Sequence, residues 1–196
     1  MNPRQVDGLK SQKHRQVDLC SFIDWSMVTS AHAFRVQRFA VDVTLDPDTA
    51  YPWLILSDDG KQVKHGDVRK NLPDNPERFS KCVNVLGQQS FSSGRFYFEV
   101  QVKGKTKWDL GVARESIKRK EFKPLSPQKA LAGPPKVGVF VDYDQGLVSF
   151  YDVDAAALIY SFTGCCFKEK LYPYFGPDLN DGGKNSDPLI ICPVGR

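Results

Sequence analysis

Three histidines are the first candidates in this chain for catalysis or metal binding. His14 and His32 lie in a polar N-terminal stretch and His65 in a charged, turn-rich stretch, and none stands at an interpretable spacing from a carboxylate or a thiol. Zinc sites need four Cys or His ligands in short paired spacings, and neither Cys-x-x-Cys nor His-x-x-x-His occurs. We therefore interpret the histidines as solvated side chains and expect no metal and no cofactor.

Nucleotide and acyl-transfer chemistry find no better support. Residues 182–186 (GGKNS) are the nearest approach to a phosphate-binding loop, but they lack its first glycine, and Asn185 stands where Ser or Thr would have to reach magnesium. A Gly-x-Ser-x-Gly nucleophile elbow is absent, and the adjacent carboxylates Asp58 and Asp59 belong to an Asp-Asp-Gly turn. We predict that this polypeptide is not an enzyme.

A basic stretch offers a third kind of chemistry. Residues 103–123 carry eight Lys or Arg against three Asp or Glu. Such a stretch could bind RNA, but no series of exposed rings accompanies the charges. We do not expect nucleic acid binding, and keep weak RNA binding through Lys103–Lys123 as an alternative.

Composition places the chain among ordinary globular proteins. It has 196 residues, a formal charge of +4, 41% hydrophobic and 12% aromatic residues, which is enough for one domain with a buried core. The polar N-terminus does not resemble a secretory signal, and no apolar run approaches a membrane span. Five cysteines at irregular spacing are typical of reduced thiols, so we expect a cytoplasmic protein: Cys20, Cys82, Cys165, Cys166 and Cys192.

Short strands must position whatever function the chain has. Residues 95–103 alternate strictly, with Phe96, Phe98 and Val100 on one face, which predicts a half-buried antiparallel strand. Residues 108–114 repeat the pattern, and we expect the two segments to form a hairpin. Residues 136–143 and 146–151 flank a turn in which Gly146 takes a positive φ, the strongest hairpin signal of the chain.

The remaining elements complete an all-β pattern. Further strands are expected over residues 40–45, 53–57, 61–65, 83–86, 156–162, 171–175 and 189–192, separated by turn residues. Helix-period stretches of ten or more residues are missing from this region. A short helix is possible over residues 21–28, in the N-terminal stretch. Many short strands at regular spacing favour a two-sheet antiparallel β-sandwich.

Several ordered segments resemble one family. Residues 43–50 (VTLDPDTA), 54–57 and 78–87 look like the PRY motif, and residues 91–100 (FSSGRFYFEV), 108–114 (WDLGVAR), 137–151 and 171–175 look like successive SPRY motifs. The chain resembles the PRY-SPRY domain of the tripartite-motif (TRIM) E3 ubiquitin ligases, closest to the fish bloodthirsty-type members. The implied organisation is a tail over 1–37, a PRY segment over 38–90 and a SPRY segment over 91–196, the last two forming one concanavalin-like sandwich.

The resemblance implies a recognition role. PRY-SPRY domains form the C-terminal module with which TRIM ligases bind substrates or pathogens, often in innate immunity. The RING finger, B-box and coiled coil of that family have no counterpart in these residues, so we expect no ubiquitin transfer from this chain and no oligomerisation segment. By position, the residues that match a ligand pocket of the family are Asp109, Leu179, Asn180 and Asp181. The sequence fits equally well with Asp109 as an outward strand residue and residues 180–181 as a plain turn.

One departure from the family is expected to matter. After Gln128 the family normally has a tryptophan-bearing pair of strands, whereas here Gln128-Lys129 joins directly to Ala130. We therefore predict a sandwich that lacks two strands, with unpaired strand edges. The leading hypothesis is a protein-interaction domain, and the alternative is a shortened isoform or scaffold remnant with no specific ligand.

Overall fold

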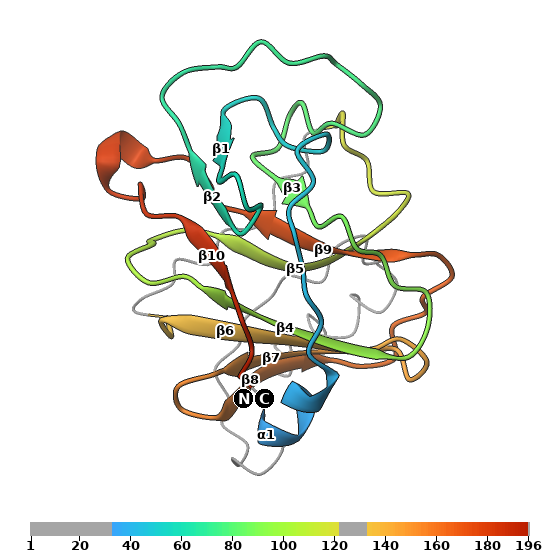
Figure 1. Cartoon of the computed structure of the whole chain (residues 1–196). Coiled ribbons are helices and arrows are strands. Elements are labelled where there is room, and N and C mark those ends of the chain that lie inside the picture. Colours follow the sequence, from blue (N-terminus) through green and yellow to red (C-terminus); the bar gives the residue numbers. More distant parts are fainter. Residues whose placement is uncertain (1–32, 122–132, 196) are drawn as a thin grey trace, which may run out of the picture.

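The computed structural model describes residues 33–121 and 133–195. Within them the chain forms two antiparallel sheets, one of seven strands and one of three (Figure 1). The helical elements of these residues are short: α1 (Ala33–Val36), and the 3-10 turns η2 (Gln37–Phe39) and η3 (Asp181–Gly183). The predicted all-β sandwich is confirmed, while the possible helix over 21–28 lies outside the described residues.

The larger sheet has the order β1-β2-β10-β4-β6-β7-β8. The hairpin predicted around Gly146 is confirmed, since β6 pairs with β7 and Gly146 has φ +60°. β10 pairs with both β2 and β4, and thereby joins segments far apart in sequence. The strands are β1 (Leu54–Leu56), β2 (Gln62–His65), β4 (Arg95–Gln101), β6 (Lys136–Asp142), β7 (Leu147–Asp152), β8 (Ala157–Phe162) and β10 (Leu189–Cys192).

The smaller sheet has the order β3-β9-β5, with β3 (Val85–Leu86), β9 (Leu171–Gly176) and β5 (Asp109–Arg114). β5 is an outer strand, because within 33–121 and 133–195 no strand pairs with it on the side away from β9. The absence of two strands from the sandwich stays a prediction. The junction after Gln128 itself lies outside the described residues.

The predicted hairpin of residues 95–103 with 108–114 is wrong. β4 belongs to the larger sheet and β5 to the smaller one, so the chain crosses between sheets at residues 102–108. The apolar faces of both strands enter the same core from opposite sides, where Phe98 of β4 and Phe175 of β9 meet with ring centroids 5.8 Å apart. Alternation reports which face is buried, but not to which sheet a strand belongs.

The outer face of β4 is also covered, which corrects the prediction of a half-buried strand. Val36 of α1 packs with Tyr97 and Phe140 in a second apolar cluster. Glu99 is buried as well, and its carboxylate accepts hydrogen bonds from the Tyr97 hydroxyl (3.0 Å) and the Gln37 amide (3.1 Å). Residues 33–37, assigned to the tail, therefore take part in the fold.

Residues 40–45, predicted as a strand, make isolated bridges instead, from Ala40 to Tyr97 and from Leu45 to Gly87. The chain between β2 and β3 then covers the outer face of the smaller sheet, where Phe79 packs edge-on against Tyr174. None of the helices in the described part of the chain is long and apolar enough to cross a membrane.

Candidate functional site

The smaller sheet brings the four predicted site residues to one of its ends. Asp109 is the first residue of β5 and pairs with Gly176, the last residue of β9, so the chain leaving β9 emerges beside Asp109. That chain carries Leu179, Asn180 and Asp181. The Lys107 ammonium lies 2.7 Å from the Asp181 carboxylate and ties this loop to the segment before β5.

Asn185 holds the two loops together from inside. It is 1% exposed, and its side-chain oxygen accepts hydrogen bonds from the backbone amides of Thr106 (2.9 Å) and Lys107 (3.2 Å). Its amide group donates to the carbonyls of Lys107 (3.1 Å), Pro177 (3.0 Å) and Leu179 (2.9 Å). The segment that the sequence places nearest to a phosphate-binding loop is thus a structural clamp.

Two carboxylates shape the electrostatics at this end of the sheet. Burial, together with the nearby charge of Asp178, raises the pKa of Asp109 to about 6. No ion pair to Asp109 is found within the described residues. Lys105 does not neutralise the pair by contact, since its ammonium donates to the carbonyls of Asn185 (3.2 Å) and Asp187 (2.9 Å). The site therefore holds an ionised carboxylate at neutral pH that a cationic ligand would stabilise.

Asp109→Asn is expected to stabilise the protein at pH 7 and to leave its stability unchanged near pH 4. The folded-state pKa of Asp109 lies above the value of 3.8 for a free side chain. The stability linked to the neutral form is therefore fully present below about pH 4 and is lost as the pH rises through about 6. Removing the ionisable group should recover about 1–2 kcal/mol above pH 6.

The measurement is the thermal midpoint of both proteins between pH 4 and pH 8. The difference between variant and wild type should grow through pH 5–6 and then level off. A difference that does not change with pH would show that the Asp109 carboxyl ionises at the same pH in the folded and unfolded states.

Exposed apolar side chains gather around the same end of the molecule. Three large hydrophobic residues of the described chain are markedly exposed: Val68 (76%), Leu179 (49%) and Ile55 (40%). The Asn180 amide donates to the Asp67 carboxylate (2.5 Å), which places Leu179 near Val68. Ile55 packs on Gly66, where an added Cβ would come within 2.7 Å of its side chain. We call this surface the loop site: Ile55, Asp67, Val68, Asp109, Leu179, Asn180 and Asp181.

Figure 1 shows why residues so far apart in sequence meet here. The turn η3 lies beside β2, and the loop that leaves β2 runs over the same side of the molecule. Ile55 and Val68 were not predicted as site residues, because Ile55 belongs to the apolar run 53–56 of a predicted strand and Val68 is a single apolar residue in a polar loop. Only the tertiary contacts of Asp67 and Gly66 reveal that they belong to one surface.

His65 corrects another expectation. Its ring stacks on Trp53 with centroids 5.9 Å apart and an interplanar angle of 9°. Burial lowers the pKa of His65, so the imidazole is neutral at pH 7. His65 is therefore half-buried against Trp53 and not fully solvated as predicted, whereas His14 and His32 lie outside the described residues.

The basic stretch 103–123 does not form one surface in its described part. Lys105 and Lys107 lie at the start of β5, and the former binds carbonyls while the latter binds Asp181. Arg119 and Lys120 lie beyond the other end of the strand, where Arg119 donates to the Glu77 carbonyl. Charges divided in this way do not make the continuous track that a nucleic acid backbone needs.

Two family models match this chain. Residues 43–91 match "SPRY-associated domain" (PRY), and residues 125–189 match "SPRY domain". Together the two models take in more than half of the chain. The chain is similar to pyrin of Homo sapiens (46% identical, covering 81% of this chain and 23% of pyrin) and to the E3 ubiquitin-protein ligase TRIM21 of Bos taurus (42% identical, covering 79% and 38%).

A solved structure shares the fold. The crystal structure of the TRIM65 PSpry domain superposes with a TM-score of 0.69 at 21% identity, over 85% of this chain and 97% of that one. This chain spans only about a quarter to two-fifths of the length of the two curated relatives. Likeness to the bloodthirsty-type members in particular stays a prediction.

Proposed function

Since the chain belongs to the PRY-SPRY family, we propose that it binds a protein partner through the loop site. The observation that carries this proposal is the gathering of the exposed residues Ile55, Val68 and Leu179 on one surface rimmed by carboxylates. Exposed apolar patches with polar rims are typical of protein-binding surfaces. Rigid sheets that carry irregular loops are a common scaffold for such recognition.

The chemistry of the loop site defines the partner that would fit. An apolar side chain would pack between Val68 and Leu179, which flank the hydrogen bond from Asn180 to Asp67. A positively charged neighbour would face Asp109 and Asp178, because the proximity of Asp178 contributes to the raised pKa of Asp109. We therefore propose a loop or terminus in which apolar and basic residues are adjacent.

At the level of the whole protein, we propose that this domain selects substrates for ubiquitin transfer by other domains, in the cytoplasm and in innate immune signalling. The similarity to TRIM21 and to pyrin supports this role. We propose no catalytic activity and no nucleic acid binding for the domain itself.

The proposal is tested by affinity capture from cells with the full chain and three variants, followed by binding of the identified partner in purified form. Leu179→Asp and Asp109→Ala should each weaken binding at least tenfold, because one removes apolar contact and the other a carboxylate from the loop site. Asp154→Asn is the matched control, since Asp154 is exposed in the turn between β7 and β8.

A partner that binds wild type and control alike, but neither loop-site variant, would support the proposal. Equal binding of all four proteins would contradict it. The absence of any saturable partner would favour the alternative of a remnant without a specific ligand. Thermal midpoints of the variants that are no lower than that of the control would establish that lost binding does not reflect unfolding.

A further inference from the structure

β5 has backbone groups that face away from its neighbour β9. The Glu115 amide donates to the Lys170 carbonyl (2.9 Å), and hydrogen-bonded residues alternate along an antiparallel pair. The backbone groups of Ala113 therefore face β9 as well, whereas those of Leu110 and Val112 face the opposite side. Within residues 33–121 and 133–195, the amides and carbonyls of Leu110 and Val112 have no hydrogen-bond partner.

The other outer strands lack such an edge. β1 and β3 are only three and two residues long, and the outer side of β3 is bonded, because the Asp46 amide donates to the Leu86 carbonyl (2.9 Å). β8 pairs with β7 through a register shift, an irregularity that protects the edges of sheets from further pairing. β5 keeps one register over six residues, and no charged residue or proline lies between Asp109 and Arg114.

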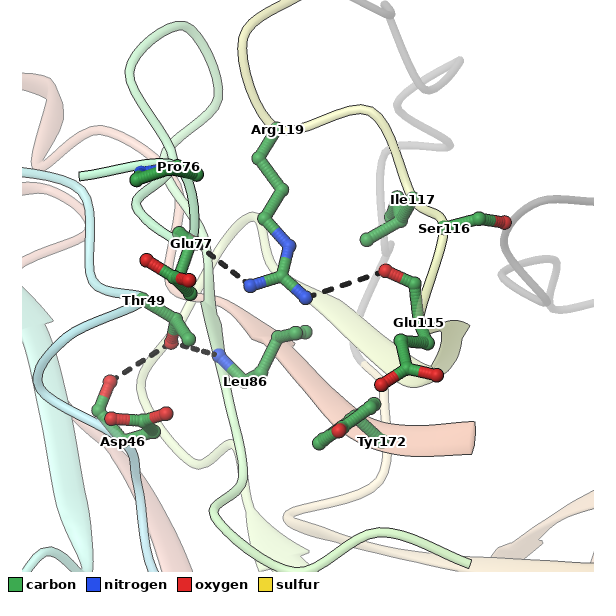
Figure 2. Close-up of a pocket in the computed structure, with 10 residues that line it drawn as sticks. All are labelled: Asp46, Thr49, Pro76, Glu77, Leu86, Glu115, Ser116, Ile117, Arg119 and Tyr172. Carbon is green, nitrogen blue, oxygen red and sulfur yellow. Dashed lines mark hydrogen bonds between the residues drawn. The ribbon is translucent and has the colours of Figure 1, made fainter. Parts of the chain in front are cut away.

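The segment that follows β5 leads away from this edge. It turns directly after the strand, where the Ile117 amide donates to the Arg114 carbonyl (3.0 Å). The Arg119 guanidinium then ties it to the chain before β3 by donating to the carbonyls of Glu77 (2.9 Å) and Glu115 (3.5 Å) (Figure 2). This segment therefore lies beside the residues that cover the outer face of the smaller sheet.

A strand added beyond β5 would lie over the end of the larger sheet that β7 and β8 form. β3, at the other side of the smaller sheet, lies by the β1–β2 turn, because the Leu45 amide donates to the Gly60 carbonyl (2.8 Å) and the next amide donates to β3. β5 is therefore turned toward the opposite end of the larger sheet. The Arg114 guanidinium agrees with this, since it donates to the Cys166 carbonyl in the loop after β8 (3.0 Å).

β8 offers apolar surface at that end. Tyr160 and Phe162 stand opposite Phe150 and Val148 of β7, two residues of the main core. Both rings of β8 are only partly buried, and they meet edge to face with centroids 4.8 Å apart. An added strand would thus find unpaired backbone groups on β5 and apolar side chains beneath it.

We infer that the outer edge of β5 binds an extended segment of a partner protein as an additional antiparallel strand. Residues of the partner opposite Leu110 and Val112 would point into the sandwich, as those two buried side chains do, and should be apolar. The residue opposite Arg114 should be acidic. Among the described residues the Arg114 guanidinium has one hydrogen bond, and its buried Nε has none.

This edge is separate from the loop site. The two surfaces share only β5, and the backbone groups of Asp109, the loop-site residue of that strand, face β9. The inference therefore does not rest on the proposed function. Leu179→Asp separates the two, because it should weaken binding at the loop site and leave binding at the edge of β5 unchanged.

The test is a titration of the isotope-labelled chain with the acetylated and amidated peptide Glu-Thr-Val-Thr-Val-Thr-Lys. Aligned antiparallel, its Glu lies opposite Arg114 and its two Val residues lie opposite Val112 and Leu110. Binding should shift the amide signals of Leu110 and Val112 saturably and slow their hydrogen exchange, whereas exchange at Gly111 and Ala113, already bonded to β9, should change little. The same peptide with both Val residues N-methylated should bind at least about tenfold more weakly, because it lacks two donors.

Val112→Pro tests the edge from the side of the protein. It removes the outward amide of Val112 and no hydrogen bond to β9. It should bind the peptide about fivefold more weakly, because one hydrogen bond is lost. Val112→Ala is the matched control, since it also loses packing but keeps the amide, and should bind within about twofold of wild type. If Val112→Pro does not fold, the N-methylated peptide decides the question.

Three results would overturn the inference. The first is equal binding of the plain and the N-methylated peptide, and the second is equal binding by Val112→Pro and Val112→Ala. The third is slow hydrogen exchange of Leu110 and Val112 in the free chain, which would show that the edge is already occupied. Slow exchange that depends on protein concentration would identify a second copy of the chain as the occupant.

Discussion

Gly146→Ala is expected to destabilise the fold by about 3 kcal/mol, the combined cost of a strained backbone and a collision. Gly146 has φ +60°, a backbone conformation that residues with a side chain rarely adopt. An added Cβ would lie 2.1 Å from the carbonyl oxygen of Cys165. That oxygen belongs to the backbone and cannot rotate away, and the Cys165 amide is already bound to the Gly146 carbonyl (2.9 Å).

Gly164→Ala is the matched control for this prediction. Gly164 has φ +70°, but an added Cβ there would meet no atom within 4 Å. Its replacement should therefore cost only the backbone strain, about 1 kcal/mol. Urea denaturation of both variants measures the difference, and equal losses in the two proteins would contradict the role of the Cys165 contact.

The turn at Gly146 illustrates what the sequence could predict about the fold. The alternation on either side of residues 144–146 and the glycine at the end of the turn were sufficient to predict the β6–β7 hairpin, because both are local properties. The approach of Cys165 to Gly146 was not predictable, since it depends on where the chain returns after β8. Local patterns predict strands and turns, but long-range contacts decide which of them are rigid.

The pairing of β4 and β5 shows the same limit. Their alternating apolar residues correctly predicted two strands with one face toward the core. The prediction of a hairpin failed because a sandwich offers the same core to strands of both sheets. The burial of Tyr97 and Glu99 was also not predictable, since it depends on α1, which lies in a stretch that reads as a polar tail.

The residues of the loop site were found in two ways, through the family resemblance and through tertiary contacts. Asp109 and residues 179–181 were predicted only through the family resemblance, because as isolated residues they read equally well as a strand position and a turn. Ile55 and Val68 carry no signal of their own in the sequence. Their place in the site follows from the hydrogen bond between Asn180 and Asp67 and from the packing of Ile55 on Gly66.

Asn185→Asp is expected to destabilise the protein by about 3–4 kcal/mol, because it turns a donor group into an acceptor at a buried position. The Asn185 amide donates to three backbone carbonyls, those of Lys107, Pro177 and Leu179. A carboxylate oxygen in place of the amide group would repel all three carbonyls, although the Asn and Asp side chains have nearly the same shape. Asn71→Asp makes the same change at an exposed position and should have little effect.

The consequence of Asn185→Asp should be concentrated at the loop site. Asp keeps the oxygen that accepts from the Thr106 and Lys107 amides, but repulsion from the three carbonyls should displace the side chain and so release the segment before β5 and the loop that carries Leu179. Hydrogen exchange at Thr106 and Lys107 should therefore accelerate more than exchange within β6 and β7. Acidification should reduce the deficit, since a protonated carboxyl regains one donor. Uniform acceleration across both sheets would instead indicate global destabilisation and would remove Asn185 from its role as the clamp of the two loops.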